Sequence, residues 1–167
     1  AELVATLEHP NGWHRDTASR LLYERQDQTA VPLLAPLLRA SARPLARLHA
    51  LGVLAGLRAL DIPAVLVGLG DADAHVRERA VLLTEKVATP GALSLALVEK
   101  LAGLVGDASA RVRFQLALTL PSLLAVQASP GLSAALVKLA GRDFADAWIA
   151  AAILSGPTEI VSGALFS

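Results

Sequence analysis

The sequence predicts an all-α fold, an α-α superhelix of about five stacked helical repeats. Three observations support this prediction. A short phrase recurs at the start of successive helices, about 30 to 36 residues apart, which is a period typical of stacked helical repeats. Apolar residues keep the same helical register after each copy of the phrase. No segment shows the alternation of apolar and polar residues that marks a half-buried strand.

The phrase is clearest in two copies. They begin at Asp71 (Asp-Ala-Asp-Ala-His-Val-Arg) and at Asp107 (Asp-Ala-Ser-Ala-Arg-Val-Arg). A weaker copy begins at Asp143, and two drifted copies begin at His9 and Ser41. The five copies divide the chain into units of one helix pair each.

An arginine closes the phrase in the first four copies, at Arg15, Arg47, Arg77 and Arg113. Ile149 stands in its place in the fifth copy, so Trp148 takes the position of Val76 and Val112 and is predicted to lie in the core. Three places after the arginine position, four of the five copies have alanine and one has leucine: Ala18, Ala50, Ala80, Leu116 and Ala152. A small residue at this point lets neighbouring helices pack closely.

The phrase and the turn residues place the helices. We expect the first helix of each pair at residues 13–25, 44–58, 74–88, 110–126 and 145–155. We expect the second helices at 29–40, 61–69, 92–105 and 131–141, with incomplete helices at 2–8 and 158–166. Asn11, Asp73 and Ser109 are expected to cap first helices, because their side-chain oxygens can accept the unpaired N–H groups of a first turn.

Composition excludes several classes of function. The 15 basic and 15 acidic residues give a formal net charge of +0, so we expect no nucleic-acid partner. The absence of cysteine excludes disulfides, thiolate metal sites and a cysteine nucleophile within these residues. Residues 114–137 carry no charge, but Pro121, Pro130 and the polar residues between them predict a helical hairpin rather than a membrane span.

Few residues have the spacing of a chemical site. No two of the four histidines lie three or four residues apart, as two metal ligands on one helix face would. His49 occupies an ordinary repeat position, and Trp13 is expected to cover an end of the array. Gly52 and Gly56 are expected to let a neighbouring helix approach. We therefore expect no catalytic, cofactor-binding or metal-ligating residue, and no cofactor.

The phrase, its arginine and its period resemble those of HEAT-repeat arrays. In that family, aspartate and arginine side chains form a ladder along the stack. The resemblance implies a ladder of Asp71, Asp107, Asp143, Arg77 and Arg113, with weaker matches at Arg15 and Arg47. His9 and Ser41 replace the aspartate in the first two copies, so we expect an incomplete ladder there.

A narrower resemblance covers most of the chain. Residues 8–18, 44–51 and 111–120 are similar to the HEAT segment of large multidomain proteins of planctomycetes and verrucomicrobia. In those proteins a predicted sugar-dehydrogenase-like β-propeller precedes the repeats and a c-type cytochrome domain follows them. The resemblance implies a periplasmic or exported protein whose redox chemistry lies in the flanking domains; without it, the compartment is unknown. No Cys-x-x-Cys-His motif occurs here, so none of that chemistry is assigned to these residues.

These observations favour one domain at residues 1–167, a fragment of a longer chain with incomplete terminal repeats. The leading hypothesis is a non-catalytic scaffold for domain–domain or protein–protein contacts within a larger exported redox protein. The alternatives are an independent peptide- or protein-binding HEAT module and a HEAT-like enzyme such as a DNA glycosylase or chromophore lyase. We expect partners on the second helices, where 30–38, 62–70 and 132–137 contain no ionisable residue, or on the ends, where a second copy could associate.

Overall fold

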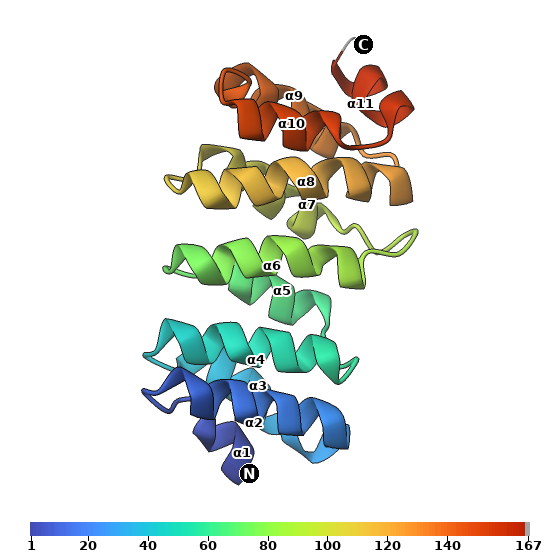
Figure 1. Cartoon of the computed structure of the whole chain (residues 1–167). Helices are drawn as coiled ribbons and strands as arrows, with labels where there is room; N and C mark the ends of the chain where they lie inside the picture. The colour runs from blue at the N-terminus through green and yellow to red at the C-terminus, as the bar shows by residue number, and fades with distance from the viewer. Residues whose placement is uncertain (166–167) are drawn as a thin grey trace. The chain divides into compact units, whose positions relative to one another are not determined.

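The computed structural model describes residues 1–165, and these residues contain helices and no β-strand (Figure 1). The predicted all-α class is therefore confirmed. The helices are α1 (Glu2–Thr6), α2 (Gly12–Arg25), α3 (Val31–Ala40), α4 (Pro44–Gly56), α5 (Ile62–Leu69), α6 (Ala74–Val87), α7 (Leu95–Gly103), α8 (Ala110–Val126), α9 (Pro130–Asp143), α10 (Ala147–Leu154) and α11 (Thr158–Leu165). Short 3₁₀ turns at Gln28–Ala30 and Leu104–Gly106 precede α3 and follow α7.

The predicted helices agree with these bounds to within a few residues. The largest difference is at the start of α7. α7 begins at Leu95, three residues later than predicted, because Ser94 accepts the N–H of Leu97 and caps the helix there. α10 begins at Ala147 because Asp146 caps it. The last predicted helix included residue 166, which lies outside the described residues.

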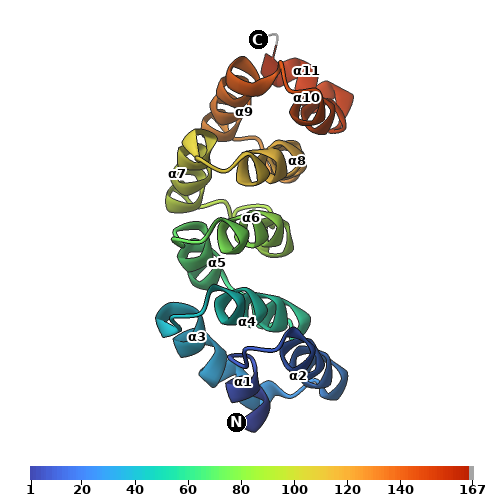
Figure 2. The same ribbon diagram turned by 60° about the vertical axis from the view of Figure 1, so that its left-hand side comes forward.

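The chain contacts group the helices into two compact units, Ala1–Lys86 and the described residues from Val87 onward. In the first unit, α4 packs beside α2 and against α3, and α5 packs against both α3 and α4. Figure 2 shows α3 and α5 on one side of this unit and α2 and α4 on the other. The predicted alanine positions Ala18, Ala50 and Ala80 are almost completely buried. Small side chains on this stripe allow the helices to pack closely.

Gly68 permits the closest approach in the first unit. A Cβ atom at this position would lie 2.8 Å from Cβ of Ala80 and 2.9 Å from Cδ1 of Leu51. Any larger residue would therefore force α5 away from α4 and α6. This glycine is therefore required by the packing between helices.

In the second unit, α8 packs against α9 and α10, and both α7 and α11 pack against α9 (Figure 2). The uncharged segment 114–137 is divided between α8, which ends at Val126, and α9, which begins at Pro130. The two helices pack against each other, so the predicted helical hairpin is confirmed. Leu116, Leu120 and Leu136 are fully buried in it.

None of the helices in residues 1–165 is by itself long and apolar enough to cross a membrane, although α10 and α11 together, bent by 115°, reach that threshold of length and composition.

The three predicted caps differ in what their side chains do. The side chain of Asn11 accepts the N–H of Trp13 at 2.9 Å, and that of Asp73 accepts the N–H of His75 at 2.9 Å. Ser109 has the extended backbone of an N-cap residue (φ −81°, ψ 119°), but its side chain makes no capping hydrogen bond. The cap position was therefore predicted correctly, and the capping role of the Ser109 hydroxyl was wrong.

The fifth copy of the phrase is shifted by one residue from its predicted register. Val76 and Val112 are the third residues of α6 and α8 and are fully buried. The third residue of α10 is Ile149, which is 2% exposed, whereas Trp148 is 77% exposed. The predicted core role of Trp148 is therefore wrong. One extra residue separates Asp143 from the cap of α10, so Ala150 occupies the arginine position.

Candidate functional site

The turns that begin the first four copies of the phrase share one hydrogen bond. In each, the side chain of the first residue accepts the backbone N–H two residues later, at 2.8–3.2 Å; the accepting residues are His9, Ser41, Asp71 and Asp107. Histidine and serine thus make the same local bond as aspartate in the drifted copies. This bond holds the backbone in the conformation that leads into the next helix.

The phrase arginines close these turns. Each is the fourth residue of its helix, and its Nη1 donates to the carbonyl six residues earlier. The four distances are 2.7 Å for Arg15 and Arg47 and 2.8 Å for Arg77 and Arg113. A side chain in a first helical turn points back toward the helix N-terminus, which brings the guanidinium to the preceding turn. The drifted copies at Arg15 and Arg47 therefore have the same geometry as the clear ones.

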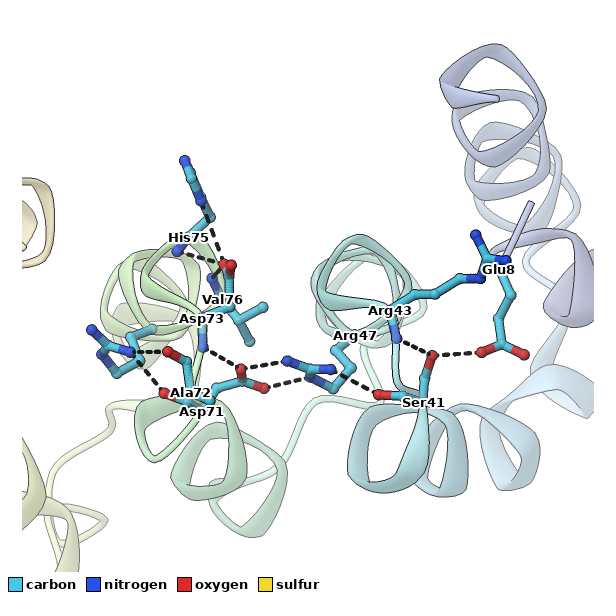
Figure 3. A network of polar contacts seen from close by, with 10 residues as sticks. Glu8, Ser41, Arg43, Arg47, Asp71, Ala72, Asp73, His75 and Val76 are labelled. Carbon is cyan, nitrogen blue, oxygen red and sulfur yellow. Dashed lines mark hydrogen bonds and ion pairs between the residues drawn. The ribbon is translucent and has the colours of Figure 1, made fainter. Parts of the chain in front are cut away.

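Arg47 and Arg113 also bind, through Nε and Nη2, the aspartate that begins the next copy of the phrase. Arg47 donates from Nε to Oδ2 of Asp71 at 2.6 Å and from Nη2 to Oδ1 at 2.7 Å (Figure 3). In the second unit, Arg113 donates in the same way to Asp143, at 2.7 and 3.2 Å. These side chains are only 6–14% exposed, so both pairs are largely removed from water.

The Arg47–Asp71 pair affects ionisation on both sides. The hydrogen bond to Asp71 raises the pKa of Arg47 above its ordinary value. Burial would by itself raise the pKa of Asp71, but the bonds from Arg47 and from the N–H of Asp73 outweigh it and hold this pKa below its ordinary value. The pair is therefore ionised at neutral pH. Charge-assisted, two-pronged bonds of this kind fix the two turns in one geometry.

The ladder is interrupted at Arg15. Its Nε is buried and has no hydrogen-bond partner among the described residues. Arg47 and Arg113 bind the aspartate that begins the next copy of the phrase, but the copy after Arg15 begins with Ser41. The hydroxyl of Ser41 donates to the carboxylate of Glu8 instead (Figure 3). A hollow of about 300 Å³ lies at this point, and Arg15, Arg43 and Leu45 are among its lining residues. The incomplete ladder expected from the sequence is therefore located at the Arg15 step.

A second hollow, of about 460 Å³, lies on the side of α2, α4 and α6. Its polar lining residues are Ser19, Arg20, Tyr23, His49 and Arg79. A Cβ atom on Gly52 would lie 3.5 Å from Nη2 of Arg79, and one on Gly56 would lie 3.0 Å from the ring of Tyr23. The two glycines were expected to admit a neighbouring helix. Gly56 admits the ring of Tyr23 from α2, whereas Gly52 has only the end of the Arg79 side chain at ordinary contact distance and borders the hollow.

Three polar groups meet at the rim of this hollow. Oγ of Ser19 lies 2.9 Å from Nδ1 of His49, and Nε2 of His49 lies 3.7 Å from Oδ1 of Asp16. Burial lowers the pKa of His49, although Asp16 acts in the opposite direction. The imidazole is thus neutral at pH 7, and the bond to Ser19 fixes its ring.

A serine, a histidine and an aspartate in this order resemble the relay of a hydrolase, but the surroundings differ. Ser19 lies in the middle of α2, where backbone N–H groups are bonded within the helix and cannot form an oxyanion hole. Asp16 is 76% exposed on its side chain and does not hold the ring within hydrogen-bonding distance. The arrangement can bind and orient a polar group, and it lacks what stabilises a tetrahedral intermediate.

The sequence did not predict this hollow, although a signal was present. His49 and Arg79 occupy the same position of consecutive repeats, two residues after the phrase arginine. Equivalent positions of stacked repeats lie side by side, so two donor side chains there imply a polar site on the outer surface of the first helices. His9 and His14 do not join it: their rings contact each other, with centroids 4.1 Å apart and planes tilted by 56°.

No group of three or more metal-ligating side chains is found within residues 1–165. No protein-family model matches the chain, and no curated protein matches it in sequence.

Proposed function

We propose that the chain is a HEAT-like repeat scaffold that mediates protein–protein or domain–domain contacts and has no catalytic activity of its own. One observation supports it most strongly. The four phrase arginines make the same bond to the carbonyl six residues earlier, in both compact units. One structural device repeated at each turn is typical of repeat arrays, in which every unit contacts its neighbours and the surface serves for binding.

The pattern of exposed apolar side chains supports a binding role. In the first unit, Trp13 and Leu45 are 67% and 48% exposed at the second positions of α2 and α4. In the second unit, Trp148 is exposed at the same position of α10. Aromatic residues left in water at equivalent positions are characteristic of contact surfaces.

The surface of α5 was the other expected docking site. Its large apolar side chains are buried or half-buried, and none is exposed. Leu33 on α3, Leu95 on α7 and Val137 on α9 are exposed. We therefore propose that second-helix contacts, where they occur, involve α3, α7 or α9, and that the strongest contacts of each unit involve its exposed tryptophan, Trp13 in the first unit and Trp148 in the second.

We further propose that the array joins sibling domains of a larger exported redox protein, as in the proteins it resembles. Reading the gene on both sides of this segment tests that part: a β-propeller upstream and a Cys-x-x-Cys-His motif downstream are expected. Other flanking domains would favour the independent protein-binding module.

Binding itself is tested with a randomised peptide display library panned against the purified chain. We expect an enriched motif whose affinity falls when Trp13 or Trp148 is replaced by alanine and is unchanged when the exposed Leu82 is replaced. Enrichment of no motif, or binding unaffected by both tryptophan replacements, would count against the scaffold.

A further inference from the structure

The hollow beside α2, α4 and α6 contains an arginine whose charge is not neutralised. Nε of Arg79 is buried and has no hydrogen-bond partner among the described residues. The arginines of the ladder contrast with it, since Arg47 uses all three guanidinium nitrogens in hydrogen bonds. A buried N–H without an acceptor is rare in folded proteins and calls for an explanation such as an unseen ligand.

The surroundings of Arg79 are suited to an anion. The residues that line the hollow include Arg20 and Arg79 and no carboxylate. Two carboxylates lie near its rim: Glu24 accepts from Arg20 at 3.2 Å, and Asp16 lies 3.7 Å from Nε2 of His49, so Arg79 carries the positive charge without a carboxylate partner among the described residues. The hydroxyl of Ser19 and the ring of His49 stand on the same wall and are joined to each other. Because one proton lies in the bond between them and the imidazole is neutral, either the O–H of Ser19 or the Nε2–H of His49 is left to donate to a ligand. An oxyanion accepts from guanidinium, hydroxyl and imidazole groups alike.

The two glycines keep this space open. Nη2 of Arg79 lies 3.5 Å from where a Cβ of Gly52 would be, so any side chain at residue 52 would project in front of the guanidinium. The volume of about 460 Å³ falls within the range of about 300–1,000 Å³ that is usual for ligand pockets.

We propose that this hollow binds the anionic group of a partner segment, a phosphate or carboxylate, with Arg79 as its principal ligand and one further donor supplied by the Ser19–His49 pair. The proposal deepens the proposed function, because it names the chemistry of the segment that the scaffold recognises. It assigns a role to groups that neither the ladder nor the caps use.

The test uses the ¹⁵N-labelled chain and the arginine Nε–H signals in its NMR spectrum. Inorganic phosphate and acetate are titrated at constant ionic strength, with chloride as the compensating salt. We expect the Nε–H signal of Arg79, identified by its loss in Arg79→Gln, to shift saturably with phosphate, with acetate, or with both. Arg79→Gln should weaken binding by about tenfold or more, because a hydrogen bond to a charged group is lost. The matched control Arg25→Gln removes the same charge from an exposed position of α2 outside the hollow, and should bind as the unchanged chain does.

Two peptides distinguish the sources of the anion: Ac-Gly-pSer-Gly-NH₂ and Ac-Gly-Glu-Gly-NH₂. Saturable binding of either one supports the proposal, and the tighter of the two identifies the group. If Arg79→Gln does not fold, Gly52→Val replaces it, with Gly141→Val, a helical glycine with open space around it, as the control. No saturable shift with any of the four ligands, or equal binding by the hollow variants and their controls, would overturn the proposal. Because small anions need no protein partner, that failure would leave the peptide-library test of the scaffold standing.

Discussion

Replacing Arg47 by alanine should destabilise the fold by about 2–4 kcal/mol. The guanidinium makes two bonds to Asp71 and one to the carbonyl of Ser41, and the Asp71 side chain is 6% exposed. Removing one member of a buried ion pair costs about 3–5 kcal/mol, because the other charge is left without compensation. The value expected here is somewhat lower, since Asp71 keeps the N–H of Asp73 at 2.8 Å. Arg47→Lys should cost about 1–2 kcal/mol, because lysine keeps the charge and loses the two-pronged geometry.

Urea denaturation followed by circular dichroism measures these free energies. The control is Arg20→Ala, which breaks the exposed pair Arg20–Glu24 and should cost about 0.5 kcal/mol or less. A double-mutant cycle with Asp71→Ala should give a coupling of about 1–3 kcal/mol. Equal losses for Arg47→Ala and Arg20→Ala, or a coupling near zero, would refute the reasoning.

The same pair has a defined dependence on pH. The pKa of Asp71 is lowered in the folded chain from its ordinary value of 3.8, so the folded state binds fewer protons than the unfolded state near that pH. Its contribution to stability is complete above this value and is lost as the pH falls through the folded pKa. In Arg47→Ala the effect of burial is no longer opposed by Arg47, so the folded pKa of Asp71 is higher than in the unchanged chain. The difference in stability between the two proteins should therefore be constant above both pKa values and shrink as the pH falls from the higher one to the lower one. A difference that stays constant down to pH 2 would contradict the pairing.

The remaining predictions concern the interrupted ladder and the fifth copy. Ser41→Asp, combined with Glu8→Gln to remove the nearby carboxylate, should raise stability by about 1 kcal/mol by giving Arg15 its missing acceptor. The same double change in an Arg15→Ala background should give no gain, and a gain there would show that the new aspartate acts elsewhere. In thermal denaturation, Ile149→Ala should lower the free energy of unfolding by about 2–4 kcal/mol and Trp148→Ala by less than about 0.5 kcal/mol. A larger loss for Trp148→Ala than for Ile149→Ala would support the register predicted from the sequence, with Trp148 in the core.

The sequence predicted the helices well because each has two local signals, a turn at its start and an apolar stripe along it. The ladder pair Arg113–Asp143 was also implied, since both residues stand in a recurring phrase. The fifth copy was placed one residue too early because Asp143 lies three residues before the cap of α10, whereas Asp71 and Asp107 lie two residues before the caps of α6 and α8. The cap at Asp146, the burial of Ile149 and the exposure of Trp148 establish the true register, and burial is a property of the packed structure.

The hollow could not be predicted from residue spacing in one helix. Its donors come from three helices, and no two of Ser19, His49 and Arg79 form a known motif along the chain. The spacing of Gly52 and Gly56 equally suits a close helix contact, so the pattern alone does not decide between a helix and a cavity. Side-chain directions in neighbouring repeats decide it, and these depend on tertiary packing.

Arg47 and Arg113 each tie two consecutive turns together through buried, two-pronged bonds, and hydrogen exchange of the arginine Nε–H groups tests this most directly. Arg47 and Arg113 donate from Nε to Asp71 and Asp143 with side chains 14% and 12% exposed. Arg20, whose side chain is 62% exposed, donates only from Nη1 to Glu24. We predict that the Nε–H signals of Arg47 and Arg113 exchange with solvent far more slowly than that of Arg20, because exchange requires the bond to open. Equal exchange rates for all three arginines would contradict the ladder.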